Sequence, residues 1–260
     1  MSVIRTDKWL LEHYEDPIAL CEKLTELFAD ASADEIYDYF IRHGMYRPLK
    51  KKRKQLDDKV WEVVQQDEGF LQKEWEGPDI PIYIFPSDER NKWIQKQLGG
   101  KSGLAFRDKL FLFISPDNTE DEIKAIFTHE YNHLCRLNRF DKSEEKYTLL
   151  DTIVLEGIAE NAVRERLGEE MTAKWASFYS DKKIEKMWTD YIVPKQELLR
   201  QDYEYQAILF GHSKYPKMLG YCAGYYVVKN YMERYSLSSK ELLAVDASVI
   251  TGDMESSGHE

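Results

Sequence analysis

The first part of the chain, to about residue 75, carries apolar side chains at the three- and four-residue spacing of amphipathic helices. Ser32 and Glu35 form the sequence pattern of a helix capping box, and Gly44 stands where the apolar run ends. A helix is therefore predicted between Ser32 and Gly44. A further helical stretch is predicted over residues 49–66, which begin with basic residues and end with valines.

The pattern changes at Gly77 and Pro78, where short apolar runs replace the helical spacing. Residues 80–86 predict one strand, with prolines at positions that suit an edge or a strand end. Leu104–Phe106 and Leu110–Ile114, separated by a charged turn, predict a hairpin. A small sheet is thus expected in the middle of the chain.

Helical spacing returns after the hairpin. Thr119 and Glu122 form a second capping-box pattern, which predicts a helix that carries the sequence Ile126–Leu134. A second, almost wholly apolar helix is predicted over residues 148–167, with Gly168 as its stop. Further helices are predicted for residues 171–191, for residues 196–209, and for a segment that begins near Pro216 and contains the small residues Gly220, Ala223 and Gly224.

These elements predict an α+β protein that is mostly helical, with a small mixed or antiparallel sheet. The sequence contains neither an internal repeat nor a long linker. We expect a helical N-terminal region over residues 1–76, a core with the sheet and the long helices over residues 77–245, and a flexible tail over residues 246–260.

The composition disfavours several classes of protein. The 260 residues are 43% hydrophobic and 32% charged, which is the balance of a globular chain. A net charge of -11 disfavours general nucleic-acid binding and electrostatic docking on anionic membranes. The basic run Lys50–Lys54 could be a nucleic-acid or targeting patch, but nearby acidic residues favour a solvated helix face. Nucleic acid and membranes are therefore not expected as partners.

Apolar runs and cysteines indicate the compartment. The N-terminal sequence lacks the apolar stretch of a signal peptide, and no run in the sequence is long enough to span a bilayer, so a cytoplasmic protein is expected. Cys21, Cys135 and Cys222 are odd in number and widely spaced, which suits neither a disulfide framework nor a CxxC metal site. They are predicted to be reduced thiols of the core.

The sequence Ile126–Leu134, IFTHEYNHL, places two histidines four residues apart on a predicted helix. At about 3.6 residues per turn, His129 and His133 lie on one face and can chelate one metal ion. Glu130 projects about 100° around the helix from His129, so its carboxylate lies beside the metal without ligating it. This is the position that a general base needs.

A catalytic zinc ion normally takes three protein ligands, so two histidines are insufficient. The most favourable source of a third ligand is the apolar helix, where Glu156 and Glu160 are also four residues apart. Two buried carboxylates on one face need a cationic or protonic partner. We therefore expect Glu156 to bind the metal and Glu160 to accept the ring N–H of a histidine, with exchanged roles as the alternative. Three acidic residues nearer to the motif lie in a polar connector and are expected to be solvated: Asp141, Glu144 and Glu145.

The combination of HEYNH and EGIAE resembles the HExxH plus ExxxD/E pattern of the gluzincin metallopeptidases, the thermolysin-like group. More closely, HEYNHLCR, LLDTIVLEGIAEN and GYCAGYYVV, within about residues 80–235, are similar to the YjaZ-type bacterial family of predicted zinc-dependent proteases. The resemblance implies a zincin-like core with zinc as its cofactor. It implies these roles for single residues: zinc ligands His129, His133 and Glu156, general base Glu130, and Glu160, where the group often has aspartate, as the partner of a ligand.

In such a site Glu130 takes a proton from the attacking water and passes it to the leaving amine, so that a peptide bond is hydrolysed. A donor for the oxyanion is also needed. Tyr221, Tyr225 and His212 are candidates, each of which could instead be structural, and the family resemblance places Tyr221 first. A peptide could also add as a strand along Leu110–Ile114 if that strand is an edge and not part of the core.

The sequence therefore predicts a zinc-dependent peptidase that acts on peptide or protein substrates. Two alternatives stay open: a zinc hydrolase of a non-peptide amide or ester, and a non-catalytic, metal-stabilised binding or regulatory module. Glu130 favours an enzyme, because a module that only binds metal needs no carboxylate there. Zinc is the expected ion, although two histidines and a glutamate also accept other divalent ions. The sequence indicates neither the cleavage specificity nor the oligomeric state.

Overall fold

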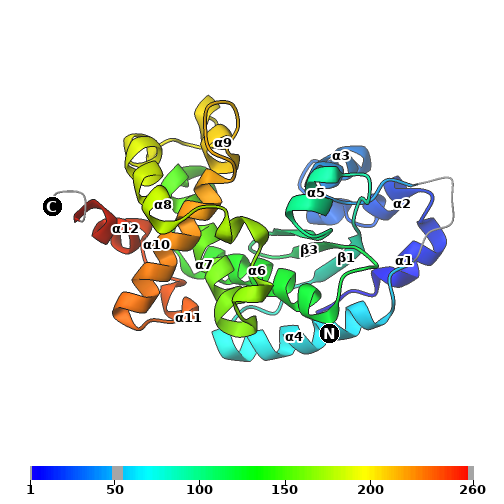
Figure 1. The fold of residues 1–260 in the computed structure, drawn as a ribbon. Helices are drawn as coiled ribbons and strands as arrows, with labels where there is room; N and C mark the ends of the chain where they lie inside the picture. Colours follow the sequence, from blue (N-terminus) through cyan, green and yellow to red (C-terminus); the bar gives the residue numbers. More distant parts are fainter. Residues whose placement is uncertain (1, 49–54, 257–260) are drawn as a thin grey trace. The chain divides into compact units, whose positions relative to one another are not determined.

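A computed structural model describes residues 2–48 and 55–256, and Figure 1 shows their helices and strands coloured from the N-terminus to the C-terminus. The chain divides into two compact units, residues 1–131 and residues 132–260. The division falls within a helix, and the regions expected on either side of residue 77 stay a prediction. The basic run Lys50–Lys54 lies outside the described residues, so both of its interpretations stay open.

The N-terminal unit begins with helices, as the apolar spacing predicts. Helix α3, Ala33–His43, starts with the expected capping box, in which the side chains of Ser32 and Glu35 each accept from the other residue's backbone N–H. It ends at Gly44, whose φ of 121° suits glycine. The other helices of this unit are α1 Thr6–His13, α2 Pro17–Glu22, α4 Lys59–Trp75 and α5 Lys92–Gln97, with a 3-10 turn at Thr25–Leu27.

The sheet contains the strands β1 Ile82–Pro86, β2 Ser102–Ala105 and β3 Leu110–Ile114. Their order is β1-β3-β2, with β3 parallel to β1 and antiparallel to β2, so the predicted hairpin is confirmed and the sheet is mixed. The option that Leu110–Ile114 is an edge for peptide addition is wrong, because β1 and β2 occupy both sides of β3. Among the described strands, β1 and β2 each pair with β3 alone, and β1 also has an isolated parallel bridge, between Val3 and Ile82.

Side chains that alternate along the strands give the sheet two faces. On one face, Phe40 of α3 contacts the rings of Phe111 and Phe113, with centroid distances of 4.7 and 5.5 Å. Helix α3 therefore covers this face (Figure 1). All residues of β3 are buried, which explains why this strand is a continuous apolar run in the sequence.

Helix α6, Glu120–Arg139, follows the sheet and carries both histidines of the motif. Thr119 and Glu122 form the hydrogen bonds of the predicted capping box. The ring of Tyr131 stacks on Trp75 of α4, with a centroid distance of 6.2 Å. The start of the helix and one of its faces are thereby fixed within the N-terminal unit.

The second unit is built on the packing of α7, Leu149–Leu167, against α10, Leu219–Tyr235. A Cβ atom at Gly157 would lie 2.3 Å from the carbonyl oxygen of Gly224. A Cβ atom at Gly224 would lie 2.1 Å from the carbonyl oxygen of Ile153. A side chain at either position would keep the helices apart, because the residues at a contact set the distance between helix axes. The expected close packing of small residues in α10 is therefore confirmed.

The remaining helices of the second unit are short. They are α8 Asp181–Met187, α9 Tyr203–Phe210, α11 Ser239–Leu242 and α12 Ala247–Ser256, with a π-helix at Trp188–Ile192 and 3-10 turns at Glu144–Lys146, Glu169–Met171, Lys174–Ser177 and Val193–Lys195. The mostly helical α+β class with a small sheet is thus confirmed, and it is the extent of several helices that differs from the prediction.

Three predicted helices differ from the structure. The helix expected over residues 49–66 begins only at Lys59, and the described residues 55–58 before it are not helical. Residues 171–191 form a succession of turns and short helices, because the backbone N–H of Ala173 donates to Glu160 and the backbone of Ser180 is extended. Residues 196–202 are not helical, since carbonyl groups in this segment accept from the first turn of α7. Residues 247–256 of the tail form α12, in which Ala247 and Ile250 are buried, and the flexibility of the tail as a whole stays a prediction.

The cysteines behave as predicted. Cys21, Cys135 and Cys222 are free and buried, and burial raises the pKa of each thiol to about 12. They are therefore protonated core residues at neutral pH. In the part of the chain that the structure describes, no helix has both the length and the apolar character needed to cross a membrane.

Candidate metal centre

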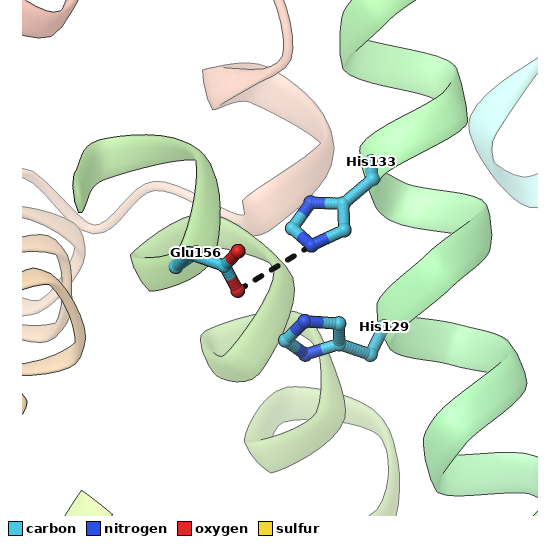
Figure 2. Close-up of side chains that lie close together, drawn as sticks. All are labelled: His129, His133 and Glu156. Carbon is cyan, nitrogen blue, oxygen red and sulfur yellow. Dashed lines mark ion pairs between the residues drawn. The ribbon is translucent and has the colours of Figure 1, made fainter. Parts of the chain in front are cut away.

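Helix α6 presents His129 and His133 on successive turns of one face, and Figure 2 shows both rings directed toward Glu156 of α7. Glu156 Oε2 lies 3.5 Å from His133 Nε2. One donor atom from each of the three side chains lies within 4.8 Å of the others. The structure therefore brings together the three residues predicted as metal ligands.

The donor set fits a zinc ion. Catalytic zinc commonly takes two imidazole nitrogens and one carboxylate oxygen, at about 2.0–2.2 Å, which separates neighbouring ligand atoms of a tetrahedral site by about 3.3–3.6 Å. The separation of 3.5 Å between His133 Nε2 and Glu156 Oε2 is of this size. Their side chains are 10% and 13% exposed, so the ligands are shielded from bulk water without being sealed off.

Glu156 is held in place by the way that α7 begins and packs. Thr148 and Asp151 form a capping box at its start. The backbone N–H groups of Leu149 and Leu150 donate to the carbonyl groups of Leu198 and Gln196, at 2.8 and 3.0 Å. First-turn N–H groups have no partner inside a helix, so these bonds complete the N-terminus of α7. Gly157 then fixes the helix against α10 at the residue that follows Glu156.

Glu160 has a different environment from Glu156. It is 4% exposed, and its carboxylate accepts the backbone N–H of Ala173 at 2.5 Å. Among the described residues, the cluster of possible ligand atoms includes Glu156 and not Glu160. The role of Glu160 as acceptor for a histidine ring N–H stays a prediction. Asp141 and Glu145 are exposed, as expected for a polar connector.

Glu130 follows the first histidine and lies against one face of strand β2. It is 7% exposed. Its Cγ, Cδ and Oε1 atoms lie 2.5, 2.6 and 2.8 Å from the point that a Cβ atom of Gly103 in β2 would occupy. The carboxylate predicted to be the general base thus lies directly against the edge strand.

The three candidates for an oxyanion donor belong to a packed cluster of rings. Tyr221 contacts Trp175 and Phe210, with centroid distances of 5.2 and 5.5 Å. His212 is exposed and stacks on Phe210. Tyr225 is buried, which raises the pKa of its phenol to about 12. These contacts give the tyrosines packing roles, and a role in catalysis stays a prediction.

Sequence reasoning missed three residues that form one group beside Glu156: Thr152, Tyr205 and Arg200. The hydroxyl of Thr152, one turn before Glu156 on α7, shares a short hydrogen bond with the phenol of Tyr205. Burial raises the pKa of this phenol, whereas Thr152 and the Arg200 guanidinium lower it and Glu156 raises it. Arg200 is exposed, so it adds an accessible positive charge to this neighbourhood. The spacing of Thr152 and Glu156 is visible in the sequence, but no local signal connects either of them to residues 200–205.

The sequence is similar to known proteins over most of its length. The family described as "Predicted Zn-dependent protease (DUF2268)" matches residues 60–252. The chain belongs to this family. It is 37% identical, over 262 residues, to the uncharacterized protein YjaZ of Bacillus subtilis (strain 168), covering 95% of this chain and 97% of that protein. The predicted resemblance to the YjaZ-type family is therefore confirmed, and the broader resemblance to the gluzincins stays a prediction.

A second relative is more distant. The chain is 21% identical, over 183 residues, to the uncharacterized protein YjfC of Bacillus subtilis (strain 168), covering 66% of this chain and 60% of that protein. No solved structure matches the chain. The comparisons thus establish a family of predicted zinc proteases, and the chemistry has to be argued from the side chains of the site.

Proposed function

We propose that the protein is a zinc-dependent peptidase. The observation that carries this proposal is the cluster of His129, His133 and Glu156, whose donor atoms lie within 4.8 Å of one another. Glu130 directly follows the first of these residues, at the position that a general base requires. The family, whose members are described as predicted Zn-dependent proteases, supports the same chemistry.

His129, His133 and Glu156 would hold the ion, and bound zinc supplies Lewis acidity toward a substrate carbonyl and toward water. The chain supplies the rest. Because His133 and Glu156 are largely buried, the electrostatic interactions of the site are screened less than those of exposed groups. The anchored start of α7 and its packing at Gly157 hold the backbone of Glu156 within the second unit.

Glu130 is the residue that moves the proton. Its carboxylate accepts a proton from the attacking water, whose oxygen forms the new bond to the carbonyl carbon. The same carboxyl group then donates this proton to the amine nitrogen as the C–N bond breaks. One water molecule and one peptide bond are consumed, and Glu130 returns to its ionised form.

The edge strand β2 offers a place for a peptide. The N–H of Phe106 donates to the carbonyl of Lys109 at 2.9 Å, so these residues form a hydrogen-bonded pair of the antiparallel ladder. In an antiparallel ladder, hydrogen-bonded pairs alternate with non-hydrogen-bonded pairs. Gly103 and Ala105 belong to non-hydrogen-bonded pairs, so their backbone N–H and C=O groups point away from β3. An extended peptide can bond to these groups, beside Glu130. This edge favours a peptide over a non-peptide amide or ester as substrate.

The test compares the wild-type protein with Glu130→Gln and the control Glu120→Gln. Glu120 lies on the same helix and is 62% exposed in its side chain, where it pairs with Lys124. We expect about one zinc ion per chain in all three proteins, because neither glutamate is a ligand. Hydrolysis of unfolded protein and mixed peptides should fall by about 10²–10⁴-fold in Glu130→Gln alone.

Two results would refute the proposal. One is hydrolysis that Glu130→Gln retains in full, which would remove the proposed base. The other is hydrolysis that survives complete removal of metal by a chelator, which would point to a different catalytic centre. Zinc binding without hydrolysis in the wild-type protein would instead support a metal-stabilised module.

A further inference from the structure

Gly103 contacts the residue proposed as the general base. A Cβ atom at Gly103 would lie 2.5, 2.6 and 2.8 Å from Cγ, Cδ and Oε1 of Glu130. These distances are well below the separation of about 3.5–4.0 Å at which carbon atoms attract each other. The Glu130 carboxylate thus occupies the space that any larger residue at position 103 would need.

The backbone at Gly103 does not itself require glycine. Its φ is not positive, and its strand conformation is therefore open to any residue. Among the glycines that the structure describes, those with a positive φ are Gly44, Gly99, Gly100, Gly168 and Gly211. Contact with Glu130 is the feature of this position that excludes a side chain.

The strand register determines which way Gly103 faces. Neighbouring residues in a strand point to opposite faces of the sheet. Ser102 faces α3, where its hydroxyl donates to the carbonyl of His43 at 2.7 Å. Gly103 therefore faces α6 and Glu130, while its N–H and C=O point to the outer edge of β2. One residue thus touches the base and offers hydrogen bonds to an incoming peptide.

We propose that Gly103 is a positioning residue for Glu130: its missing side chain lets the carboxylate stand directly against the strand that receives the peptide. The proposal rests on the peptidase function proposed above. Since Glu130 is only 7% exposed, it has little space in which to avoid an added methyl group. A methyl group would displace the carboxylate by on the order of 1 Å to restore normal contact, and such a misplacement can cost about 10²-fold in rate.

The first experiment compares Gly103→Ala with the control Gly69→Ala. A Cβ atom at Gly69, on α4, would have no heavy atom within 4 Å, so this control makes the same chemical change without the contact. We expect Gly103→Ala to keep its zinc and to lower kcat by about 10²-fold, with KM changed much less. Gly69→Ala should have the same kcat and KM as the wild-type protein. A loss of zinc in Gly103→Ala would overturn the proposal.

Double variants separate an effect through Glu130 from a general disturbance of β2. In a Glu130→Gln background, Gly103→Ala should cause almost no additional loss, because the base is already absent. In a Glu130→Asp background, the carboxylate is withdrawn by one methylene group, so Gly103→Ala should cost less than tenfold. Equal fractional losses in all backgrounds would show that the methyl group disturbs peptide binding directly, and the proposal would fall.

A spectroscopic measurement tests the proposal without hydrolysis. Cobalt(II) in place of zinc gives a visible spectrum whose pH midpoint follows ionisation at the metal, and Glu130→Gln should shift this midpoint. Gly103→Ala should shift it in the same direction, with no further shift in the double variant. If Glu130→Gln shifts the midpoint and Gly103→Ala does not, the positioning role is refuted even for an active peptidase. A protein that binds no cobalt or zinc would refute the proposed function itself, and the positioning role with it.

Discussion

Glu156 Oε2 of α7 lies 3.5 Å from His133 Nε2 of α6, while Glu160, one turn further along α7, bonds to the backbone N–H of Ala173. The two glutamates are equivalent in the sequence, because both occupy the apolar helix at helical spacing. The structure makes them unequal. Glu156 stands with the histidines, whereas Glu160 fixes the turn that follows the helix.

The first prediction concerns this inequality. Glu156→Gln removes the anionic member of the donor set and should abolish or greatly weaken zinc binding. Glu160→Gln should cost about 10–100-fold in affinity at most, the usual effect of losing a partner outside the ligand set. Zinc titrations of both variants, monitored with a competing chromophoric chelator, measure the difference in zinc affinity. If Glu160→Gln is the variant that cannot bind, the two roles must be exchanged.

The second prediction concerns removal of metal. A ligand that binds only the folded state adds about 2.7 kcal/mol when it is present at 100 times its Kd. For a domain of this size, a chelator should therefore lower the melting temperature by roughly 5–10 °C, and added zinc should restore it. Glu156→Gln is the matched control and should melt at the same temperature with and without zinc. An equal zinc response in the control would place the ion elsewhere.

The third prediction concerns the oxyanion donor. If Tyr221 or His212 stabilises the oxyanion, Tyr221→Phe or His212→Ala should lower kcat by about 10²-fold and change KM little. Arg200→Ala belongs to the same series, since its exposed guanidinium interacts with Tyr205 close to Glu156. Steady-state kinetics on one peptide would rank the three variants. Unchanged kcat for Tyr221→Phe and His212→Ala, with a loss for Arg200→Ala, would assign the role to Arg200.

Local signals predicted the parts of the site that depend on one helix. The spacing of His129 and His133 suffices to place both rings on one face. The capping pattern of Thr119 and Glu122 places the start of α6, since the hydrogen bonds of a capping box join residues three positions apart. Gly168 correctly marks the end of α7. These features need no knowledge of the tertiary structure.

Contacts between distant segments could not be predicted in the same way. The sequence of Leu110–Ile114 is compatible with either an edge or a central strand, and the parallel addition of β1 decides between them. Residues 196–202 have a helix-like pattern, but their carbonyls bond to the first turn of α7, and tertiary context overrides local preference. The contact between Gly103 and Glu130 likewise depends on how β2 lies against α6.

The last prediction concerns the close approach of α7 and α10. A methyl group at Gly157 would overlap the carbonyl oxygen of Gly224, which belongs to the backbone of a long helix and cannot rotate away. Gly157→Ala should therefore destabilise the protein by about 1–3 kcal/mol or more, the usual cost of overpacking. Gly69→Ala is the matched control, because Gly69 also lies inside a helix and has open space around it. This control should raise stability by about 0.5–1 kcal/mol, since alanine is the better helix former.

The two substitutions are expected to change the free energy of unfolding in opposite directions, so one comparison tests the prediction. Urea unfolding of both variants, in the presence of a chelator, measures the stability without a contribution from metal. Zinc titration of Gly157→Ala adds a second result, because a shift of α7 also changes the position of Glu156 relative to His133 and should weaken binding. A Gly157→Ala variant as stable as Gly69→Ala, with unchanged zinc affinity, would show that the helices separate without cost and that Glu156 is not held by this contact.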